Sequence, residues 1–271
     1  MTDEGRKLSF ELCCRRFASG ELQGDGIGTY SEKRLHKVLK HYFCPDETCH
    51  EVRIKPDGSA VMERKGDSKA ESGRGGFIAD IFKDGKIIEI QTGSFYPLKK
   101  KIEFYLSKTD YEITVVHPLA AVKWISWIST EDGSVSGRKR SPKKCAAFEV
   151  LPELFWLSEW LGNPRLHFKI MLLEIDEFRI LNGWSADKKK GAERYERVPT
   201  ALLDEVDFCA PDFAKALIPQ GIGDNFTASH FSKITKLKGR KLSYTLKLLC
   251  QCGAIERGEK AGRSYTYKLK I

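Results

Sequence analysis

Residues 77–95 read FIADIFKDGKIIEIQTGSF and contain two short apolar runs on either side of an Asp-Gly pair. This arrangement favours a hairpin, because the turn needs positive φ angles and glycine adopts them without steric cost. Alternate side chains of a strand share a face, so Glu89 and Gln91 lie together, and pairing through the turn brings Asp80 near Glu89. Burial alone disfavours such polar side chains on apolar strands. The stretch therefore predicts a polar cluster with a functional role.

A helix is expected before the hairpin, over residues 31–43, which read SEKRLHKVLKHYF. Ser31 is a suitable N-cap for it. The apolar positions follow helical spacing at Leu35, Val38, Leu39 and Tyr42. Glu32 lies on or beside this apolar face. Residues 51–54 then favour a strand, and residues 55–76 form a polar insertion rich in glycine and lysine.

A second helix and further strands are expected after the hairpin. Pro97 opens a helix over about residues 98–107, with lysines at 99–101 in its first turn. Residues 111–118 and 123–129 predict two strands. The order helix, strand, hairpin, helix, strand favours a mixed α/β sheet, because a helix crosses between strands of one sheet.

The acids and their order resemble the motif of the PD-(D/E)XK nuclease superfamily. Glu32 stands on a helix, Asp80 on a strand, and the segment Glu89-x-Gln91 on the next strand. The resemblance covers residues 31–117, where the order of elements is similar to the restriction-endonuclease-like core. It implies an α/β fold with a restriction-endonuclease-like mixed sheet and flanking helices, and a metal-dependent nuclease activity.

Two positions depart from the pattern of that superfamily. Ala79 stands where the superfamily name has proline, and Gln91 stands where it has lysine. The resemblance implies that glutamine is sometimes accepted there. A glutamine is neutral and cannot act as a general acid or base, so it can only orient a water. The missing positive charge is expected from Lys99, or from Lys100 beside it, at the start of the following helix.

The expected chemistry is metal-assisted hydrolysis of a phosphodiester. Asp80 and Glu89 are expected to bind one Mg²⁺ or Mn²⁺, assisted by the Ile90 carbonyl and waters. Glu32 completes the acid cluster, directly or through a water, and Gln91 orients the attacking water. The metal lowers the pKa of a bound water and neutralises the charge that develops on the scissile phosphate.

A purely structural interpretation of the same residues stays open. In it, Asp80 caps the turn region, Glu89 pairs with a lysine and Gln91 faces solvent. Glu32 and the order of elements favour the nuclease interpretation, since acids on apolar strands are more common at functional sites.

Positive charge is concentrated at the C-terminal end. The chain carries a net charge of +9, and residues 221–271 contain eleven lysines and arginines against three acids. Residues 208–224 suit an interdomain linker because of their prolines and glycines. Thr227 is an N-cap for a helix, residues 240–252 form a second helix, and residues 253–269 form a hairpin. This order is a winged-helix arrangement.

Side chains of this basic module are expected to contact nucleic acid. Those on the second helix are Arg240, Lys241, Ser243, Tyr244 and Lys247. Those on the hairpin tip are Arg257, Lys260 and Arg263. A winged helix can instead bind protein, but the charge favours nucleic acid. A further contact set is expected in the polar loop 182–199, for which a solvated surface is the alternative. Its members are Lys188, Lys189, Lys190 and Arg194.

The intervening residues predict an amphipathic helix over 148–161, a long strand over 166–179 and a short helix over 200–206. The expected division of the chain is a nuclease-like domain over 1–207 (core about 31–130, extension about 143–207), a linker over 208–224 and a winged helix over 225–271.

Composition narrows the class of protein. Of 271 residues, 41% are hydrophobic and 31% charged, and no apolar run approaches the length of about 20 residues that a membrane span needs. The first residues lack an apolar signal core, and the eight cysteines show no regular spacing, so a cytoplasmic protein with reduced thiols is expected.

The sequence thus predicts a metal-dependent phosphodiesterase that acts on nucleic acid, with DNA favoured over RNA, and that is recruited by a basic winged helix. The alternative is a non-catalytic winged-helix DNA-binding regulator, in which the nuclease-like domain senses a ligand or mediates dimerisation. Nucleic acid is the expected partner, a membrane is not, and a homodimer is left open.

Overall fold

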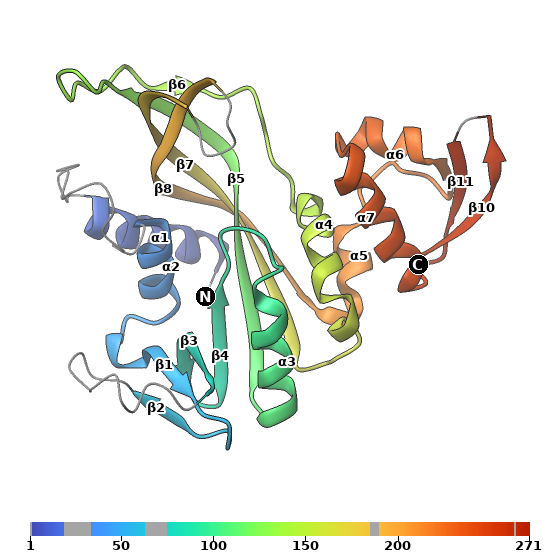
Figure 1. Cartoon of the computed structure of the whole chain (residues 1–271), viewed down its shortest axis with the longest axis horizontal. Coiled ribbons are helices and arrows are strands. Elements are labelled where there is room, and N and C mark those ends of the chain that lie inside the picture. Colours follow the sequence, from blue (N-terminus) through green and yellow to red (C-terminus); the bar gives the residue numbers. More distant parts are fainter. Residues whose placement is uncertain (1, 19–33, 63–74, 185–189, 263) are drawn as a thin grey trace. The chain divides into compact units, whose positions relative to one another are not determined.

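A computed structural model describes residues 2–18, 34–62, 75–184, 190–262 and 264–271. The strands of the larger sheet are β1 (His50–Ile54), β2 (Ala60–Met62), β3 (Phe77–Lys83), β4 (Lys86–Ile90), β5 (Glu112–Ile128), β6 (Lys139–Arg140), β7 (Leu166–Trp184) and β8 (Lys190–Cys209). Their order is β2-β1-β3-β4-β5-β7-β8, with β6 paired to β5 (Figure 1). The sheet is mixed, because β3 and β4 pair antiparallel and β4 and β5 pair parallel.

Helices accompany this sheet, and a small second sheet lies near the C-terminus. The helices are α1 (Asp3–Ala18), α2 (Arg34–Phe43), α3 (Leu98–Lys108), α4 (Leu151–Leu154), α5 (Phe213–Leu217), α6 (Ala228–Thr235) and α7 (Gly239–Gln251). Short 3₁₀ helices are η1 (Glu47–Cys49), η2 (Ala147–Val150), η3 (Phe155–Trp160) and η4 (Ala210–Asp212). The second sheet is antiparallel, in the order β10-β11-β9, and comprises β9 (Asn225–Thr227), β10 (Ile255–Ala261) and β11 (Ser264–Leu269). The expected mixed α/β class is confirmed.

Contacts divide the chain into two compact units. The first unit comprises Met1–His50, Pro118–Ala146 and Met171–Glu205. The second unit comprises Glu51–His117, Ala147–Ile170 and Val206–Ile271. The residues expected to form a nuclease-like domain are therefore divided between the units, and the hairpin and the basic C-terminal residues both belong to the second.

In the first unit, α1 packs against α2. The rings of Phe10 and Tyr42 meet edge to face, with centroids 5.1 Å apart. Leu35, Val38 and Leu39 are buried, as the helical spacing predicts. Glu32, the predicted acid at the start of this helix, lies outside the described residues.

In the second unit, the predicted hairpin is confirmed. Asp84 and Gly85 have φ angles of 50° and 72°, the positive values that a two-residue turn requires. The register places Ile81 opposite Ile88. The chain then crosses through α3 and returns as β5, which pairs parallel with β4 (Figure 1).

Helix α3 packs against β3 of the hairpin, and Arg165, which precedes β7, holds its C-terminal end. Phe104 meets Phe77 of β3 with ring centroids 5.3 Å apart, and Tyr105 is fully buried. The Arg165 guanidinium donates hydrogen bonds to the carbonyls of Leu106 and Thr109, both at 2.6 Å. These contacts satisfy carbonyls that the helix end leaves unpaired.

Several predicted elements between residues 111 and 206 are wrong. Residues 111–118 and 123–129 form one continuous strand, β5, instead of two. Residues 200–206, predicted as a short helix, belong to the long strand β8, as do residues 190–199 of the predicted loop. Residues 148–161 form η2, α4 and η3 in succession instead of one helix.

The C-terminal elements follow the predicted order of helix, helix and hairpin. Thr227 caps α6, and its side chain accepts a hydrogen bond from the His230 N–H. The predicted linker 208–224 contains the end of β8, η4 and α5. Among the described residues, none of the helices has the length and apolar character that a membrane crossing would need.

Candidate active site on the β3–β4 hairpin

Asp80 of β3 lies beside Glu89 of β4. Residues opposite each other in a sheet share a face, and Ile81 opposite Ile88 brings the preceding and following residues together. The Asp80 Oδ2 atom accepts a hydrogen bond from the Ile90 N–H at 2.7 Å. This bond crosses the hairpin and holds the carboxylate at the end of β4. The two acids from neighbouring strands are therefore held close together.

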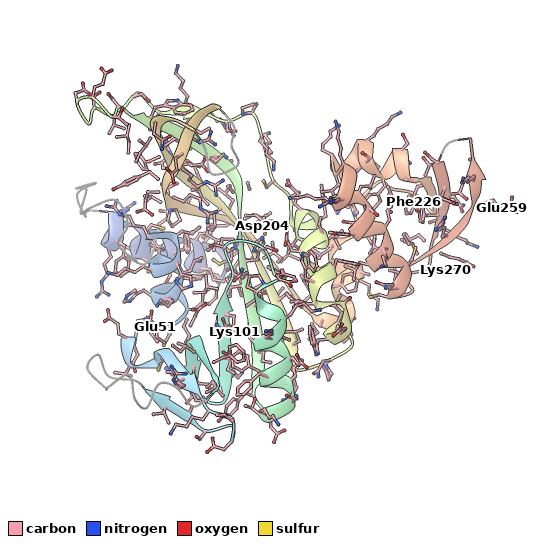
Figure 2. The ribbon with its side chains drawn as sticks, viewed as in Figure 1. Glu51, Lys101, Asp204, Phe226, Glu259 and Lys270 are labelled. Carbon is pink, nitrogen blue, oxygen red and sulfur yellow. The ribbon has the colours of Figure 1, made fainter. Side chains whose placement is uncertain are left out.

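Glu89 is buried and has two partners on α3. Only 2% of its surface is exposed. The Lys101 Nζ atom lies 2.7 Å from Glu89 Oε2, and the Tyr105 hydroxyl donates to Glu89 Oε1 at 2.9 Å. Lys101 and Tyr105 are four residues apart, so both project from the same side of the helix. Figure 2 marks Lys101 on α3.

This environment changes the ionisation of Glu89. Burial raises the pKa of Glu89 to about 7, the Lys101 ammonium opposes the rise, and the negative charge of Asp80 adds to it. Burial and the neighbouring Glu89 also raise the pKa of Tyr105, which therefore stays a hydrogen-bond donor. Near neutral pH, Glu89 is poised between its protonated and ionised forms.

Lys101, which the sequence did not single out, provides the cation at this site. The predicted Lys99 lies elsewhere on the helix surface: its Nζ is 3.8 Å from Glu159 and 5.9 Å from the ring centre of Trp160, both on η3. Lys100 is exposed. Lys101 also precedes the buried Ile102 directly, which places its stem beside the packed side of α3.

Gln91 follows Glu89 on the chain but uses its side chain locally. Its side-chain amide donates a hydrogen bond to the Ser94 carbonyl. Its backbone carbonyl lies 2.5 Å from Nδ1 of His117, a buried histidine on β5. The ring of His117 meets Phe95 edge to face at 5.0 Å. His117 was not predicted, because one histidine in an apolar strand carries no signal of its neighbours.

The donor chemistry of the hairpin suits a hard divalent cation. Asp80 and Glu89 offer carboxylate oxygens, and magnesium sites commonly use one or two carboxylates together with waters and substrate phosphates. Across the part of the chain that the structure describes, no group of three or more histidine, cysteine, aspartate or glutamate side chains is arranged to hold a metal. The expected third acid, Glu32, lies outside those residues.

A family described as "Domain of unknown function (DUF8091)" matches residues 59–209, more than half of the chain. The chain belongs to this family. The DUF8091 region contains the β3–β4 hairpin, α3 and strands β5 to β8, so it contains both acids and Lys101.

One relative is an uncharacterized protein of Treponema pallidum (strain Nichols). It is 26% identical over 171 residues, which cover 63% of this chain and 57% of that protein. No solved structure matches the chain.

The basic C-terminal segment follows the DUF8091 region. On α7, Arg240, Lys241, Ser243 and Lys247 are exposed. Tyr244 is half-buried and stacks on Phe155 of η3, with ring centroids 4.5 Å apart and an interplanar angle of 4°. The Lys247 ammonium also lies 5.4 Å from the Phe155 ring centre. One side of α7 therefore packs against η3.

The hairpin of this segment carries a second group of cations. The Arg257 guanidinium lies 3.4 Å from the ring centre of Tyr265, and the Lys260 ammonium lies 5.3 Å from it. Arg263 lies outside the described residues. A groove of about 1060 Å³ runs between α7 and β10, and Ser243, Lys247 and Arg257 line it.

The lysines and arginine predicted around residues 188–194 are only partly described. Lys188 and Lys189 lie outside the described residues, and Lys190 begins β8. Arg194 is described, and its Nε lies 3.3 Å from the buried Glu177. Lys123 and Arg179 also contact Glu177, at 3.4 and 2.5 Å. Burial raises the Glu177 pKa, but these cations outweigh it and hold that pKa below its usual range.

Proposed function

We propose that the chain is a metal-dependent phosphodiesterase that cuts nucleic acid, with DNA favoured over RNA. The order α2, β1, β3–β4, α3, β5, with β4 and β5 parallel, supports a fold of the PD-(D/E)XK type. The order α6, α7, β10, β11, with β9 beside β11, supports a winged helix.

The arrangement around Glu89 is the observation that carries the proposal. Two acids meet across a hairpin, one of them is almost completely buried, and an ammonium group lies 2.7 Å from it. Burying a carboxyl group costs free energy, so a protein that needs only stability gains more from an apolar residue there. Perturbed acids of this kind are more common at functional sites.

Asp80 and Glu89 would hold Mg²⁺ or Mn²⁺, assisted by the Ile90 carbonyl and waters. When bound, the metal supplies a Lewis acid for the phosphate and lowers the pKa of a coordinated water. The Ile90 N–H orients the Asp80 carboxylate. The buried Tyr105 hydroxyl orients Glu89 by donating a hydrogen bond to its Oε1 atom.

Lys101 would supply the positive charge that the lysine of the PD-(D/E)XK motif supplies. Its ammonium group favours the ionised form of Glu89, and it would stabilise negative charge on a phosphate bound beside that acid. Gln91 then has no charge to supply, and its amide instead fixes the chain after β4 through the Ser94 carbonyl.

The basic module would bring the substrate. The groove between α7 and β10 presents Lys247 and Arg257, and Arg240 and Lys241 are exposed at the start of α7. Phosphate contacts of this kind give affinity and position without sequence specificity.

A second function is supported by the hydrogen bonds and the ion pair that the two acids already make within the protein. Both Glu89 oxygens have partners on α3, and Asp80 accepts from the Ile90 N–H. Acids with these hydrogen-bond partners are also compatible with a purely structural core that has no catalytic role. In that case the protein is a DNA-binding regulator, and the winged helix performs the function.

A cleavage assay separates these functions. The purified chain is incubated with plasmid, single-stranded DNA or RNA, each with Mg²⁺, Mn²⁺ or EDTA. Cutting that requires the metal and is abolished by EDTA is the expected result, with DNA cut faster than RNA. Binding to DNA without cutting under any of these conditions would favour the regulator.

A further inference from the structure

A cavity of about 810 Å³ in the second unit brings a cysteine and a histidine together. The Cys209 Sγ atom at the end of β8 lies 3.2 Å from Nδ1 of His167 on β7. Both side chains line the cavity and both are partly exposed. Its described lining does not include Asp80, Glu89 or Lys101, so it is a separate site.

The cavity wall carries charges of both signs. Its six charged residues form three pairs, Lys169 with Asp207 at 2.6 Å, Lys86 with Glu112 at 3.4 Å and Lys215 with Asp212 at 4.0 Å. The rings of Phe168 and Phe208 stack at 5.3 Å and form an apolar wall. A ligand with both an ammonium and a carboxylate group matches this alternation better than a simple anion or cation.

A thiol in contact with an imidazole is a more reactive nucleophile than an isolated thiol. The thiolate is the reactive form of cysteine, and a neighbouring histidine that accepts the proton increases its population. We propose that Cys209 is a modification site, activated by His167, that exchanges with low-molecular-weight disulfides of amino-acid or peptide character.

The exchange conserves atoms and electrons. The proton of Cys209 moves to His167 Nδ1, and the thiolate attacks one sulfur of the disulfide RS–SR. A bond forms between Cys209 Sγ and that sulfur, and the RS–SR bond breaks. The departing RS⁻ takes the proton from the imidazolium and leaves as RSH. Cys209 is oxidised to the mixed disulfide, and one half of the reagent is reduced to the thiol.

Glutathione disulfide is the probe, and peptide mapping by mass spectrometry is the readout. The reduced full chain is incubated with the probe, and the rate of glutathione addition is measured at each cysteine. Cys209 is expected to react roughly tenfold or more faster than the other cysteines. Cys250 is the matched comparison, because it is also half-buried, and burial raises its pKa. Cys14, buried with its pKa raised to about 12, should stay unmodified.

Variants distinguish activation of Cys209 by His167 from simple exposure of the Cys209 thiol. Cys209→Ser should remove the fast addition, and Cys250→Ser should leave it unchanged. His167→Asn should slow addition at Cys209 by roughly tenfold. A rate at Cys209 no greater than that at Cys250 in the unaltered chain would overturn the proposal, and so would an unchanged rate in folded His167→Asn. The comparison within the unaltered chain needs no variant, so it decides the question whether or not His167→Asn folds.

Discussion

The ammonium group of Lys101 lies 2.7 Å from the carboxylate of Glu89. Glu89 is on β4, and Lys101 is on α3, the helix that connects β4 to the parallel strand β5. The pair puts a positive charge beside a buried acid, on the hairpin that also carries Asp80. A lysine at position 91 would have been expected to provide that charge. Here α3 provides it, so the proposed site does not require a lysine at position 91.

Replacing Lys101 by alanine should reduce cleavage by about 10² to 10³-fold, because the site loses the charge that stabilises the ionised Glu89 and the phosphate. The initial rate of plasmid cutting in Mn²⁺ measures this. Lys100→Ala is the matched control, since Lys100 is the neighbouring exposed lysine. Equal cutting rates for Lys101→Ala and Lys100→Ala would show that Lys101 has no role in the proposed site.

Stability should depend on pH through Glu89. Burial raises its pKa from 4.5 to about 7 in the folded chain. The folded state therefore holds this proton more tightly than the unfolded state, and its contribution is complete below about pH 4.5 and lost as the pH rises through about 7. The loss amounts to roughly 3 kcal/mol.

Glu89→Gln keeps the neutral form at every pH, so its free energy of unfolding should rise relative to that of the unaltered chain between about pH 5 and 8. Urea unfolding across that range measures the difference. A difference between the two chains that does not change with pH would show that Glu89 ionises in the folded chain as it does in the unfolded one.

The basic residues of α7 should control the salt dependence of DNA binding. Replacing Arg240, Lys241 or Lys247 by alanine should each weaken binding to all sequences and reduce the slope of log K against log salt by about one. Fluorescence anisotropy at several salt concentrations gives the slope. Lys108→Ala, on the exposed end of α3, should leave it unchanged. The assignment fails for any α7 residue whose substitution behaves like Lys108→Ala.

Tyr244 should act mainly through packing. Its ring stacks on Phe155 and meets Trp156 edge to face at 5.6 Å. Tyr244→Ala should therefore lower the free energy of unfolding by about 1–2 kcal/mol, while Tyr244→Phe should retain most of it. Denaturant unfolding checks both. Unchanged stability in Tyr244→Ala, together with weaker DNA binding, would instead support the predicted groove contact.

The local parts of the fold were predictable from sequence. The Asp84-Gly85 turn needs positive φ angles, and it brings the two apolar runs beside it together as neighbouring antiparallel strands. The caps and spacing of α3 and α6 are also local signals. The meeting of Asp80 and Glu89 follows from that turn, so half of the candidate site could be read before the structure was known.

Most of the wrongly predicted elements depend on long-range strand pairing. Residues 200–206 read TALLDEV, which has good helix propensity, but they pair as part of β8. Pro118 suggested a strand end. However, β4 last pairs with β5 at Val116, so the missing N–H of Pro118 costs no bond to β4 and β5 continues. Pro152 lies in the first turn of α4, between η2 and the rest of the predicted single helix.

Lys101 could not be chosen from the sequence because three lysines follow one another. Which of them faces the hairpin depends on how α3 is rotated about its axis. The buried side chains of Leu98, Ile102 and Tyr105 set that rotation, and it leaves Lys101 beside Glu89 and Lys99 beside η3. Which side of α3 faces the hairpin is set by tertiary packing, so the sequence alone does not show it.

The most direct test of the account is the Mn²⁺-dependent cleavage of DNA by the chain in which Asp80→Asn and Glu89→Gln are combined. Both substitutions keep the size of the side chain and remove its charge, so thermal unfolding should confirm that the variant is folded. We predict that the unaltered chain cuts plasmid DNA and that the double variant does not, while both bind DNA equally. Full retained cleavage by the folded double variant would contradict the assignment of the active site to this hairpin.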